Sequence, residues 1–352
     1  MRIGLFSSSL PHRDRKPGGV DVFVDNLGNR LADRGHAVTM FSFSQPPHDA
    51  GYGSIRLAPA SHAHSKLARL SLVPLALNRL DTSSIDVLHL HGDDWFFVSR
   101  RVPTVRTFHG SALQEARTAT GFKRRASQFV TFMLEIMSSR LATRSYVLGP
   151  LQGASYAPAG VLSDAVEVPP NATMTRSDPP IILFVGTWTG RKRGRLLYEA
   201  FHRDVLPRVP SAQLHMVSDE CPEGANVRWW DRPSKAELDN LYRRAWVFCL
   251  PSTYEGFGLP YAEAMAAGTP VVSTANPGAI HVLDRGRAGL IVSERELGHR
   301  LFEVLTNPDL RLSLARSGRV QVRRFDWAPT IEAHERAYQE AIAAWQTRRL
   351  DR

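Results

Sequence analysis

Two acidic side chains flank a glycine-rich loop in the C-terminal half of the chain. Glu255 opens the segment EGFGL, and Glu263 follows eight residues later inside a predicted helix. The loop offers free backbone N–H groups and two glycines that let a ligand approach, at the positive end of a helix dipole. This arrangement predicts a phosphate site, and the two carboxylates suit a ligand with hydroxyls at both ends. A nucleotide sugar has that layout, with sugar, diphosphate and ribose in a row.

The surrounding elements place this loop between a strand and a helix. Residues 247–250 are apolar and end at a proline, as expected of a buried parallel strand. Residues 261–267 are rich in good helix formers until a glycine stops them, and residues 271–274 begin another strand. The segment therefore predicts strand, loop, helix and strand, with the phosphate loop at the start of the helix.

At these residues the chain resembles the family-4 retaining glycosyltransferases of GT-B fold. The family pattern of Glu, seven residues and Glu inside EGFGLPxxEAMAxGTPVV is matched almost letter for letter. PGGV at residues 17–20 and GHAV at residues 35–38 are similar to the opening of family members. The resemblance spans nearly the whole chain and is strongest in residues 1–40 and 181–292.

Length predicts two domains, and the resemblance implies that both are α/β. At 352 residues the chain is longer than a single hydrophobic core usually supports, and 43% hydrophobic and 22% charged residues are typical of a soluble globular protein. The resemblance implies a GT-B fold, with two Rossmann-like domains facing each other across a cleft. We expect an acceptor-side domain at residues 1–170, a nucleotide-sugar donor domain at 171–327, and a C-terminal helix at 328–352 that crosses back to the first domain.

Composition also excludes several classes of protein. Two cysteines are too few for a disulfide framework, and no basic leader or membrane-length apolar run is present in the sequence. We therefore expect a cytoplasmic protein. The formal charge of +10 favours an anionic partner. Nucleic acid is disfavoured because the sequence contains no recognised binding module or zinc spacing.

The first domain supplies two further candidates. Residues 17–20 form a glycine turn into a predicted helix, but GxGxxG is missing, so a dinucleotide cofactor is not indicated. By resemblance, Gly19 in this turn contacts the donor diphosphate. His109 ends a predicted strand at residues 102–108, and Thr-Phe-His here resembles a family element that faces the donor sugar and phosphate. His109 is therefore one catalytic candidate.

Other polar pairs in this domain are interpreted as structural. His89 and His91 alternate with leucines, so they share one face of their strand. Asp93 and Asp94 invite a metal-binding interpretation, but an Asp pair without a third oxygen ligand is more often a helix cap or turn. By resemblance, the chemistry of the family needs no metal.

A second glycine-bounded loop, GTWTGRKRG at residues 186–194, also predicts phosphate binding. Its three consecutive cations at the start of a helix would be unfavourable without an anion. Relatives usually show an Arg directly after the strand glycine and a Lys-Gly at the helix start. Here Thr187 occupies the first place, and Arg193, followed by glycine, takes the Lys role by resemblance. Arg191 or Lys192 then replaces the first cation, and an Arg fork changes the geometry expected around the diphosphate.

Resemblance assigns roles to the acidic residues and the loop between them. Glu255 binds the sugar hydroxyls and is the second catalytic candidate, while Glu263 binds the ribose diol. The diphosphate meets backbone N–H groups of Phe257, Gly258 and Leu259. The implied course is front-face attack by an acceptor hydroxyl, with the departing phosphate taking the proton, so no dedicated base is required. No cofactor is expected, because the nucleoside-diphosphate sugar is the donor substrate.

Two tryptophans, Trp229 and Trp230, are unusual for this part of a family member. Either one could stack on the nucleobase. A tryptophan pair at the end of a strand is more often buried in the core, so we expect burial here.

The acceptor is the least specified part of the interpretation. Residues 121–146 look like a basic amphipathic helix, with Lys123, Arg124 and Arg125 near its start. Such a helix can lie on an anionic membrane, although an apolar stripe flanked by arginines more often faces a core. The acceptor remains open between a glycan, a lipid carrier and a small molecule, with peripheral contact to an anionic membrane as one alternative.

The sequence thus predicts a retaining, metal-independent hexosyltransferase that moves a sugar to an acceptor hydroxyl, in cell-envelope glycan or glycolipid synthesis. A natural-product glycosyltransferase is an alternative, as is a nucleotide-sugar epimerase of the same fold, which would need further acid/base carboxylates. An NAD-dependent dehydrogenase is disfavoured by the missing glycine fingerprint. A non-catalytic sugar-nucleotide binding protein stays open because of the substituted cation at Thr187.

Overall fold

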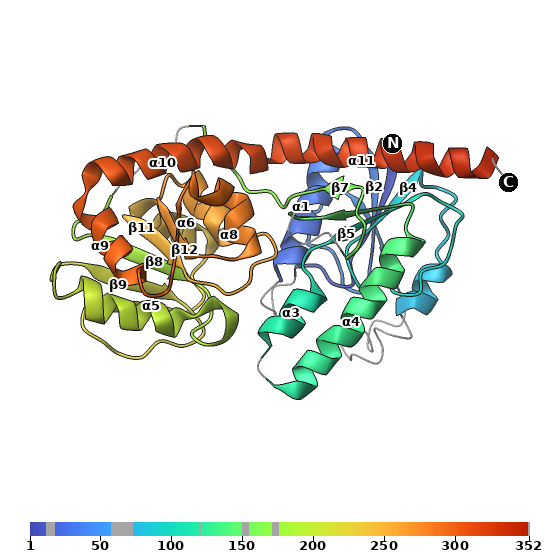
Figure 1. Cartoon of the computed structure of the whole chain (residues 1–352). Coiled ribbons are helices and arrows are strands. Elements are labelled where there is room, and N and C mark those ends of the chain that lie inside the picture. Colours follow the sequence, from blue (N-terminus) through green and yellow to red (C-terminus); the bar gives the residue numbers. More distant parts are fainter. Residues whose placement is uncertain (12–17, 58–72, 120, 150–154, 171–175, 351–352) are drawn as a thin grey trace. The chain divides into compact units, whose positions relative to one another are not determined.

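The chain forms two compact units (Figure 1). The computed structural model describes residues 1–11, 18–57, 73–119, 121–149, 155–170 and 176–350. Unit 1 comprises Met1–Ala116, Phe122–Asp164 and Ala328–Arg352, and unit 2 comprises Arg117–Gly121 and Ala165–Trp327. The sequence predicted domains at 1–170 and 171–327 and a terminal helix at 328–352.

Unit 1 is built on a sheet that, in the described residues, has seven strands in the order β3-β2-β1-β4-β5-β6-β7. All its strand pairs are parallel, and the central strands β1, β4 and β5 are buried along nearly all of their length, although β4 and β5 also carry polar side chains. The strand order reverses between β1 and β4, the position at which open α/β sheets bind ligands. The strands are β1 (Arg2–Phe6), β2 (Ala37–Ser42), β3 (Gly53–Arg56), β4 (Val87–Leu90), β5 (Thr104–Phe108), β6 (Arg144–Val147) and β7 (Gly160–Val161).

The helices of unit 1 include α1 (Gly19–Asp33), α3 (Ala112–Thr118), α4 (Phe122–Leu141) and α11 (Trp327–Leu350). Helix α1 begins where Asp21 accepts a hydrogen bond from the backbone N–H of Gly18, which closes its first turn. Helix α11 packs on the same sheet, because Tyr338 hydrogen-bonds to His89 at 2.9 Å and Glu335 pairs with Arg34 at 2.8 Å. The last stretch of the chain thus completes the first unit.

Unit 2 is also built on one parallel sheet, which has six strands in its described residues, in the order β10-β9-β8-β11-β12-β13. These are β8 (Ile181–Val185), β9 (Gln213–Val217), β10 (Val227–Trp230), β11 (Val247–Leu250), β12 (Val271–Thr274) and β13 (Leu290–Val292). The helices are α5 (Gly194–Ala200), α6 (Lys235–Arg244), α7 (Leu259–Ala266), α8 (Pro277–Val282), α9 (Leu297–Thr306) and α10 (Pro308–Val322). Every pair is parallel, so the prediction of two Rossmann-like α/β domains is confirmed.

The expected burial of the tryptophan pair is wrong. Both residues end β10, which pairs only with β9 and is therefore an edge strand of the described sheet. Trp229 is 52% exposed, and its indole N–H donates to the carbonyl of Ser218 at 3.0 Å. Trp230 is partly buried. An edge strand has sheet on one side only, which leaves large side chains uncovered.

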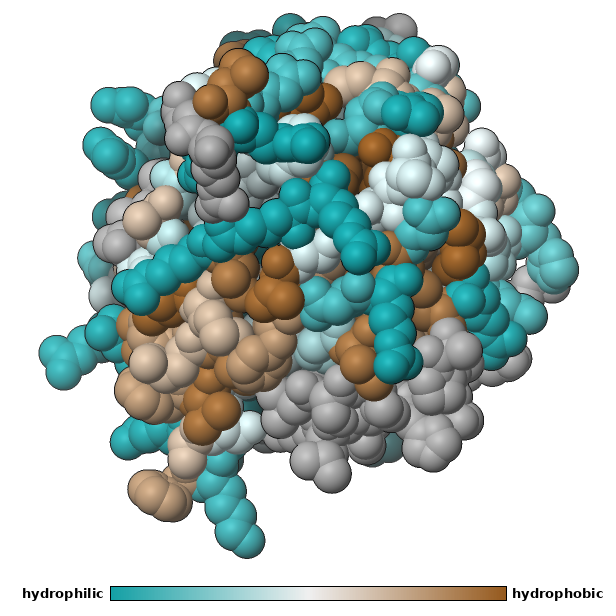
Figure 2. All heavy atoms as spheres, turned by 90° about the vertical axis from the view of Figure 1, so that its right-hand side faces the viewer, coloured by the Kyte–Doolittle hydropathy of each residue, from teal (hydrophilic) through white to brown (hydrophobic). Residues whose placement is uncertain are grey.

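Helix α4 turns much of its apolar stripe outward rather than toward the core of unit 1. Phe122, Phe129, Val130 and Met133 are each at least half exposed, while the neighbouring Phe132 is buried. Brown, hydrophobic side chains gather at the lower left of Figure 2, over this helix. The expectation that the stripe faces a core is therefore wrong for these residues. Among the helices of the described residues, none is long and apolar enough to cross a membrane.

Candidate functional site

The two predicted phosphate loops meet at the point where the strand order of unit 2 reverses. Strands β8 and β11 are neighbours, with Val247 opposite Ile182, and both run in the same direction. The basic loop of residues 186–194 leaves the carboxyl end of β8, and the loop of residues 251–258 leaves that of β11. Open α/β sheets bind ligands at such a switch point. Two segments about sixty residues apart in sequence therefore form one candidate site.

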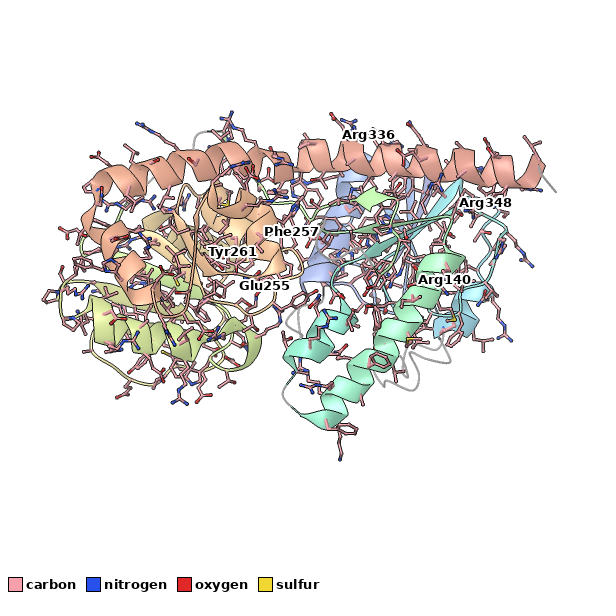
Figure 3. The ribbon with its side chains drawn as sticks, in the orientation of Figure 1. Arg140, Glu255, Phe257, Tyr261, Arg336 and Arg348 are labelled. Carbon is pink, nitrogen blue, oxygen red and sulfur yellow. The ribbon has the colours of Figure 1, made fainter. Side chains whose placement is uncertain are left out.

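Glu255, which is labelled in Figure 3, belongs to the second of these loops and is almost fully buried. Its carboxylate pairs with Lys192 Nζ at 2.8 Å and with Arg191 Nη1 at 3.0 Å. Burial alone would raise the pKa of Glu255, but the two cations outweigh burial, so its pKa lies below the usual value. The carboxylate is therefore ionised at neutral pH. The structure thus brings together Glu255, Arg191 and Lys192, and the binding roles assigned to them stay predictions.

Backbone bonds hold the two loops against each other. The carbonyl of Arg191 accepts hydrogen bonds from Thr253 N at 2.8 Å and Ser252 Oγ at 2.9 Å. The guanidinium of Arg191 donates in return to the carbonyl of Tyr254 at 2.8 Å. The cations and the carboxylate are thus positioned by main-chain contacts, which is how an electrostatic site avoids reorganisation when charge develops.

Arg193 lies apart from this cluster. It pairs with Glu294 at 2.5 Å, and its backbone has φ of 61°, in the left-handed region that favours glycine. That conformation directs Lys192, rather than Arg193, toward Glu255. The geometry therefore favours Lys192 for the lysine role that resemblance gave to Arg193.

The start of α7 presents backbone rather than side chains. Gly258 has φ of 99°, and a Cβ there would lie 2.4 Å from the ring of Tyr261, so a side chain would be strained twice over. The ring of Phe257 is buried and packs edge-on against Phe325, with ring centres 5.1 Å apart. Phe257, Gly258 and Leu259 can therefore offer a ligand their N–H groups, as the sequence predicted for them.

Glu263 lies one turn into α7 and is held by a tyrosine from α6. The hydroxyl of Tyr242 donates to Glu263 Oε2 at 2.9 Å. Burial raises the pKa of Glu263, and the bond from Tyr242 opposes part of that shift. Both Glu255 and Glu263 interact electrostatically with Lys192, and Glu255 is the one in direct contact with it.

A buried hydrogen-bond network beneath this loop was not predicted from the sequence. The hydroxyl of Tyr261 accepts from Ser273 Oγ at 2.8 Å and from Asn276 Nδ2 at 3.1 Å. Asn276 also caps α8 by accepting from Ala279 N at 2.9 Å. Gly278 follows, where a Cβ would lie 2.4 Å from the carbonyl of Phe257. Asn followed by Pro is a helix-start signal that could have marked this cap.

Gly19 and His109 belong to unit 1, at the carboxyl edge of its sheet. Gly19 begins α1, and the ring of Phe23 in that helix packs edge-on against His109, with ring centres 5.5 Å apart. His109 Nε2 lies 2.9 Å from His91 Nδ1, and His109 Nδ1 lies 3.4 Å from Asp164. His91, which the sequence suggested was structural, is thus in direct contact with the candidate His109.

The neighbouring polar residues of unit 1 have structural partners. Asp94 pairs with Arg106 at 2.9 Å inside the core and accepts from Ser138 Oγ at 2.6 Å, which ties β5 to α4. His89 bonds to Tyr338 and Thr107. These contacts give Asp94 and His89 structural roles, although Asp94 forms a core ion pair rather than the expected cap or turn.

Two family models match the chain in succession. Glycosyltransferase Family 4 matches residues 17–172, and Glycosyl transferases group 1 matches residues 170–321. The second match contains the cluster of Glu255, Lys192 and Arg191, and the first contains Gly19 and His109.

Known glycosyltransferases match this chain over nearly the whole length of both proteins. The phosphatidyl-myo-inositol mannosyltransferase of Mycobacterium tuberculosis is 27% identical, with 96% of this chain and 97% of the relative covered. The D-inositol 3-phosphate glycosyltransferase of Corynebacterium jeikeium is 25% identical, with 92% of each covered.

Solved structures agree in fold. The sucrose-phosphate synthase of Thermosynechococcus elongatus has a TM-score of 0.77 at 22% identity, with 97% of this chain and 99% of that chain covered. WaaG, a glycosyltransferase involved in lipopolysaccharide biosynthesis, has a TM-score of 0.71 at 17% identity, with 94% and 98% covered. The two consecutive family matches show that the chain belongs to the group 1, family 4 glycosyltransferases, and the likenesses to solved structures show that its fold is GT-B.

Proposed function

We propose that this glycosyltransferase moves a sugar, with retention, from a nucleoside-diphosphate sugar to the hydroxyl of a cell-envelope glycolipid or glycan precursor. The observation that carries the donor proposal is the buried cluster in which Glu255 holds Lys192 and Arg191 beside the start of α7. A buried carboxylate beside two cations and free N–H groups suits a ligand that joins a polyol to a diphosphate.

In this proposal, Lys192 and Arg191 exchange Glu255 for the diphosphate of the donor. Without a ligand, Lys192 and Arg191 neutralise Glu255. On donor binding, the diphosphate takes the two cations, and Glu255 becomes free to accept hydrogen bonds from the sugar hydroxyls. As the glycosidic bond breaks, negative charge grows on the leaving phosphate and positive charge on the sugar, so both halves of the cluster stabilise the transition state. The departing phosphate then takes the proton of the acceptor hydroxyl, and no side chain need act as base.

A panel of nucleotide sugars tests this proposal. Thermal unfolding with each donor identifies the nucleotide and sugar, because a ligand of the native state raises the unfolding temperature. Incubation of that donor with extracted envelope lipids should then give a glycosylated product with the anomeric configuration of the donor. An epimerised nucleotide sugar formed from the donor alone would favour the epimerase alternative. Binding without any product or hydrolysis would favour a binding protein.

Replacing Glu263 with Ala is expected to weaken binding of the free nucleoside diphosphate by about tenfold, whatever sugar the donor carries. The reason is the proposed hydrogen bond between this carboxylate and the ribose diol, which Tyr242 orients. Isothermal titration calorimetry measures the effect directly. Tyr242→Phe is the matched control for orientation and should weaken binding less. Equal affinity of wild type and Glu263→Ala for the nucleoside diphosphate would remove the ribose assignment.

The acceptor proposal rests on the outward face of α4. The helix carries half-exposed apolar side chains along its first two thirds and three consecutive cations, Lys123, Arg124 and Arg125, at its start. The relative from M. tuberculosis is named for a lipid acceptor. We infer that α4 contacts an anionic membrane surface with its apolar stripe in the interface and its cations at the headgroups.

Neutralising Lys123, Arg124 and Arg125 together by Gln should weaken binding to anionic vesicles by about 100-fold at low salt, since each cation contributes about 1 kcal/mol. Flotation with phosphatidylglycerol vesicles measures the change.

The matched control is a triple Gln variant of Arg203, Arg232 and Arg287, three exposed cations of unit 2. It removes the same charge and should bind vesicles as the wild type does. Failure of the wild type to float would move a water-soluble acceptor to first place. Donor binding should be unchanged in both variants.

A further inference from the structure

A cavity of about 520 Å³ opens at the edge of unit 1 opposite to His109. Its floor includes Thr104, the first residue of β5, and Thr143, which directly precedes β6. Because the sheet is parallel, the amino ends of the strands lie at the other edge from the carboxyl ends that carry His109 and Gly19. The cavity is therefore separate from the candidate residues already described in this unit.

Five arginines from three segments line this cavity. Two come from the loop before β5, one from the end of α4 and two from the end of α11. Figure 3 shows Arg140 and Arg348 on the same side of unit 1. The arginines are Arg100, Arg101, Arg140, Arg348 and Arg349. None of the described residues that line the cavity is acidic.

The local negative charge does not balance these cations. The carbonyl ends of α4 and α11 point here, and each contributes about half a negative charge. Within the described residues, no ion pair joins any of the five arginines to a carboxylate. Hydrogen bonds from Ser83 lower the pKa of Asp81, and the more distant charge of Arg101 lowers it slightly further. Among the described residues and the two helix ends, a net positive charge of about three or more remains at the cavity.

The cavity walls are held in place by contacts that do not involve a ligand. Thr104 N donates to Thr143 Oγ1 at 3.0 Å, and Thr143 N donates to Thr104 Oγ1 at 2.9 Å, so the floor is closed by a reciprocal pair. The indole of Trp345 donates to the carbonyl of Arg100 at 3.1 Å, which joins α11 to the loop. The guanidinium of Arg349 lies 4.6 Å from the centre of the Trp345 ring. These contacts therefore join the segments that carry the arginines, whose side chains are exposed.

We propose that this cavity is a second anion site, which binds a phosphate ester that carries a small polyol. Guanidinium groups match the oxygens of phosphate in pairs, and the half-buried Ser99 of the lining can bond a hydroxyl of the polyol. A volume of about 520 Å³ exceeds what bare phosphate needs and lies in the range of small-molecule sites. The ligand is either a free phosphate ester or the headgroup of an anionic lipid.

The position of Arg140 supports an anionic lipid as the source of the ligand. Arg140 lies on α4, two turns beyond the exposed side chain of Met133, so one helix carries both the apolar stripe and a wall of the cavity. Figure 2 looks onto this end of unit 1, with long hydrophilic side chains across the middle of the view beside the brown surface over α4. The inference goes beyond the proposed sugar transfer and does not depend on it, because no residue of the cavity belongs to the donor cluster.

The experiment compares three single-charge variants of the full chain. Arg140→Gln and Arg348→Gln each remove one guanidinium group from the lining of the cavity. Arg336→Gln is the matched control, because this arginine is exposed on α11 and is absent from the lining (Figure 3). Circular dichroism should show that all three variants fold equally. A fourth variant, Arg348→Lys, keeps the positive charge but loses the paired N–H donors of the guanidinium.

Two probes separate the two sources. Glycerol 3-phosphate, titrated by calorimetry, reports a free ester, and vesicles of phosphatidylglycerol against phosphatidylcholine report a headgroup. With the ester, we expect at least about a tenfold loss of affinity in Arg140→Gln and Arg348→Gln, a smaller loss in Arg348→Lys and none in Arg336→Gln. The same ranking on vesicles alone would assign the lipid source. If the cavity variants and Arg336→Gln behave alike with both probes, the proposal is wrong, whatever the donor experiments show.

Discussion

Replacing Glu255 with Gln is expected to lower kcat by about 100- to 1000-fold, as loss of a group aimed at developing charge does in other enzymes. The amide keeps the shape of the side chain but removes the negative charge that would stabilise a cationic sugar. Donor affinity should change by less than about threefold, because the substitution also releases Lys192 and Arg191 to hold the diphosphate more firmly. The split between kcat and affinity is the signature of a group that acts in the transition state.

Initial rates and calorimetric donor titrations measure the two quantities separately. Glu294→Gln is the matched control, since this glutamate pairs with Arg193 in the same loop but lies half exposed outside the cluster. It should leave kcat within about twofold of the wild type. A Glu255→Gln enzyme with normal kcat and a raised KM would show that the carboxylate only binds the ground state.

Acidification is expected to unfold unit 1 through its buried histidines. His334 of α11 is fully buried, and burial lowers its pKa from about 6.5 to about 4, with the charge of His109 adding to the shift. Burial also places the pKa of His89 and His91 well below the usual value. Groups that face this cluster include Phe23 and Tyr338, whose rings contact His334, and the charged Arg106 and Asp164.

The sign follows from these directions. A histidine whose folded pKa is depressed stabilises the fold fully above its unfolded pKa, and this stability is lost as the pH falls from about 6.5 toward 4. For His334 alone the loss amounts to about 3 kcal/mol. Denaturant unfolding at several pH values should show the decline in that window.

A substitution of His334 tests whether the buried histidines cause the acid unfolding. His334→Phe cannot take up a proton, so the midpoint of acid unfolding should fall by about one pH unit. The control is His299→Gln, because His299 is an exposed residue of α9 in unit 2. Equal midpoints for wild type and His334→Phe would show that the buried histidines do not govern acid stability.

Much of unit 2 could be predicted because its signals are local. The apolar run of residues 247–250, the glycines of the following loop and the good helix formers after it are contiguous, so they predict strand, loop and helix without tertiary information. Parallel topology then requires that carboxyl ends of strands share one edge. That rule places Glu255 and the basic loop of residues 186–194 at the same edge, and the adjacency of β8 and β11 in the structure makes them neighbours.

The parts that sequence reasoning missed depend on backbone turns and on distant partners. Whether Lys192 or Arg193 faces Glu255 is decided by a left-handed residue within three consecutive cations, and a count of glycines cannot reveal this. The bond from Tyr242 to Glu263 joins two helices. The exposure of Trp229 follows from the edge position of β10, and strand order is a property of the whole sheet. For α4, periodicity predicted an apolar stripe but not what covers it.

The path of α11 has a consequence for the order of events during synthesis. Nearly all of unit 2 comes from one continuous stretch, so it can fold as soon as that stretch has left the ribosome. Unit 1 needs contacts such as His89 to Tyr338, which join residues 249 positions apart. Its sheet must therefore wait, with His89 uncovered, until a segment translated after all of unit 2 arrives. The first domain in sequence should be the last to reach its native state, and while it waits it is the part of the nascent protein most in need of a chaperone.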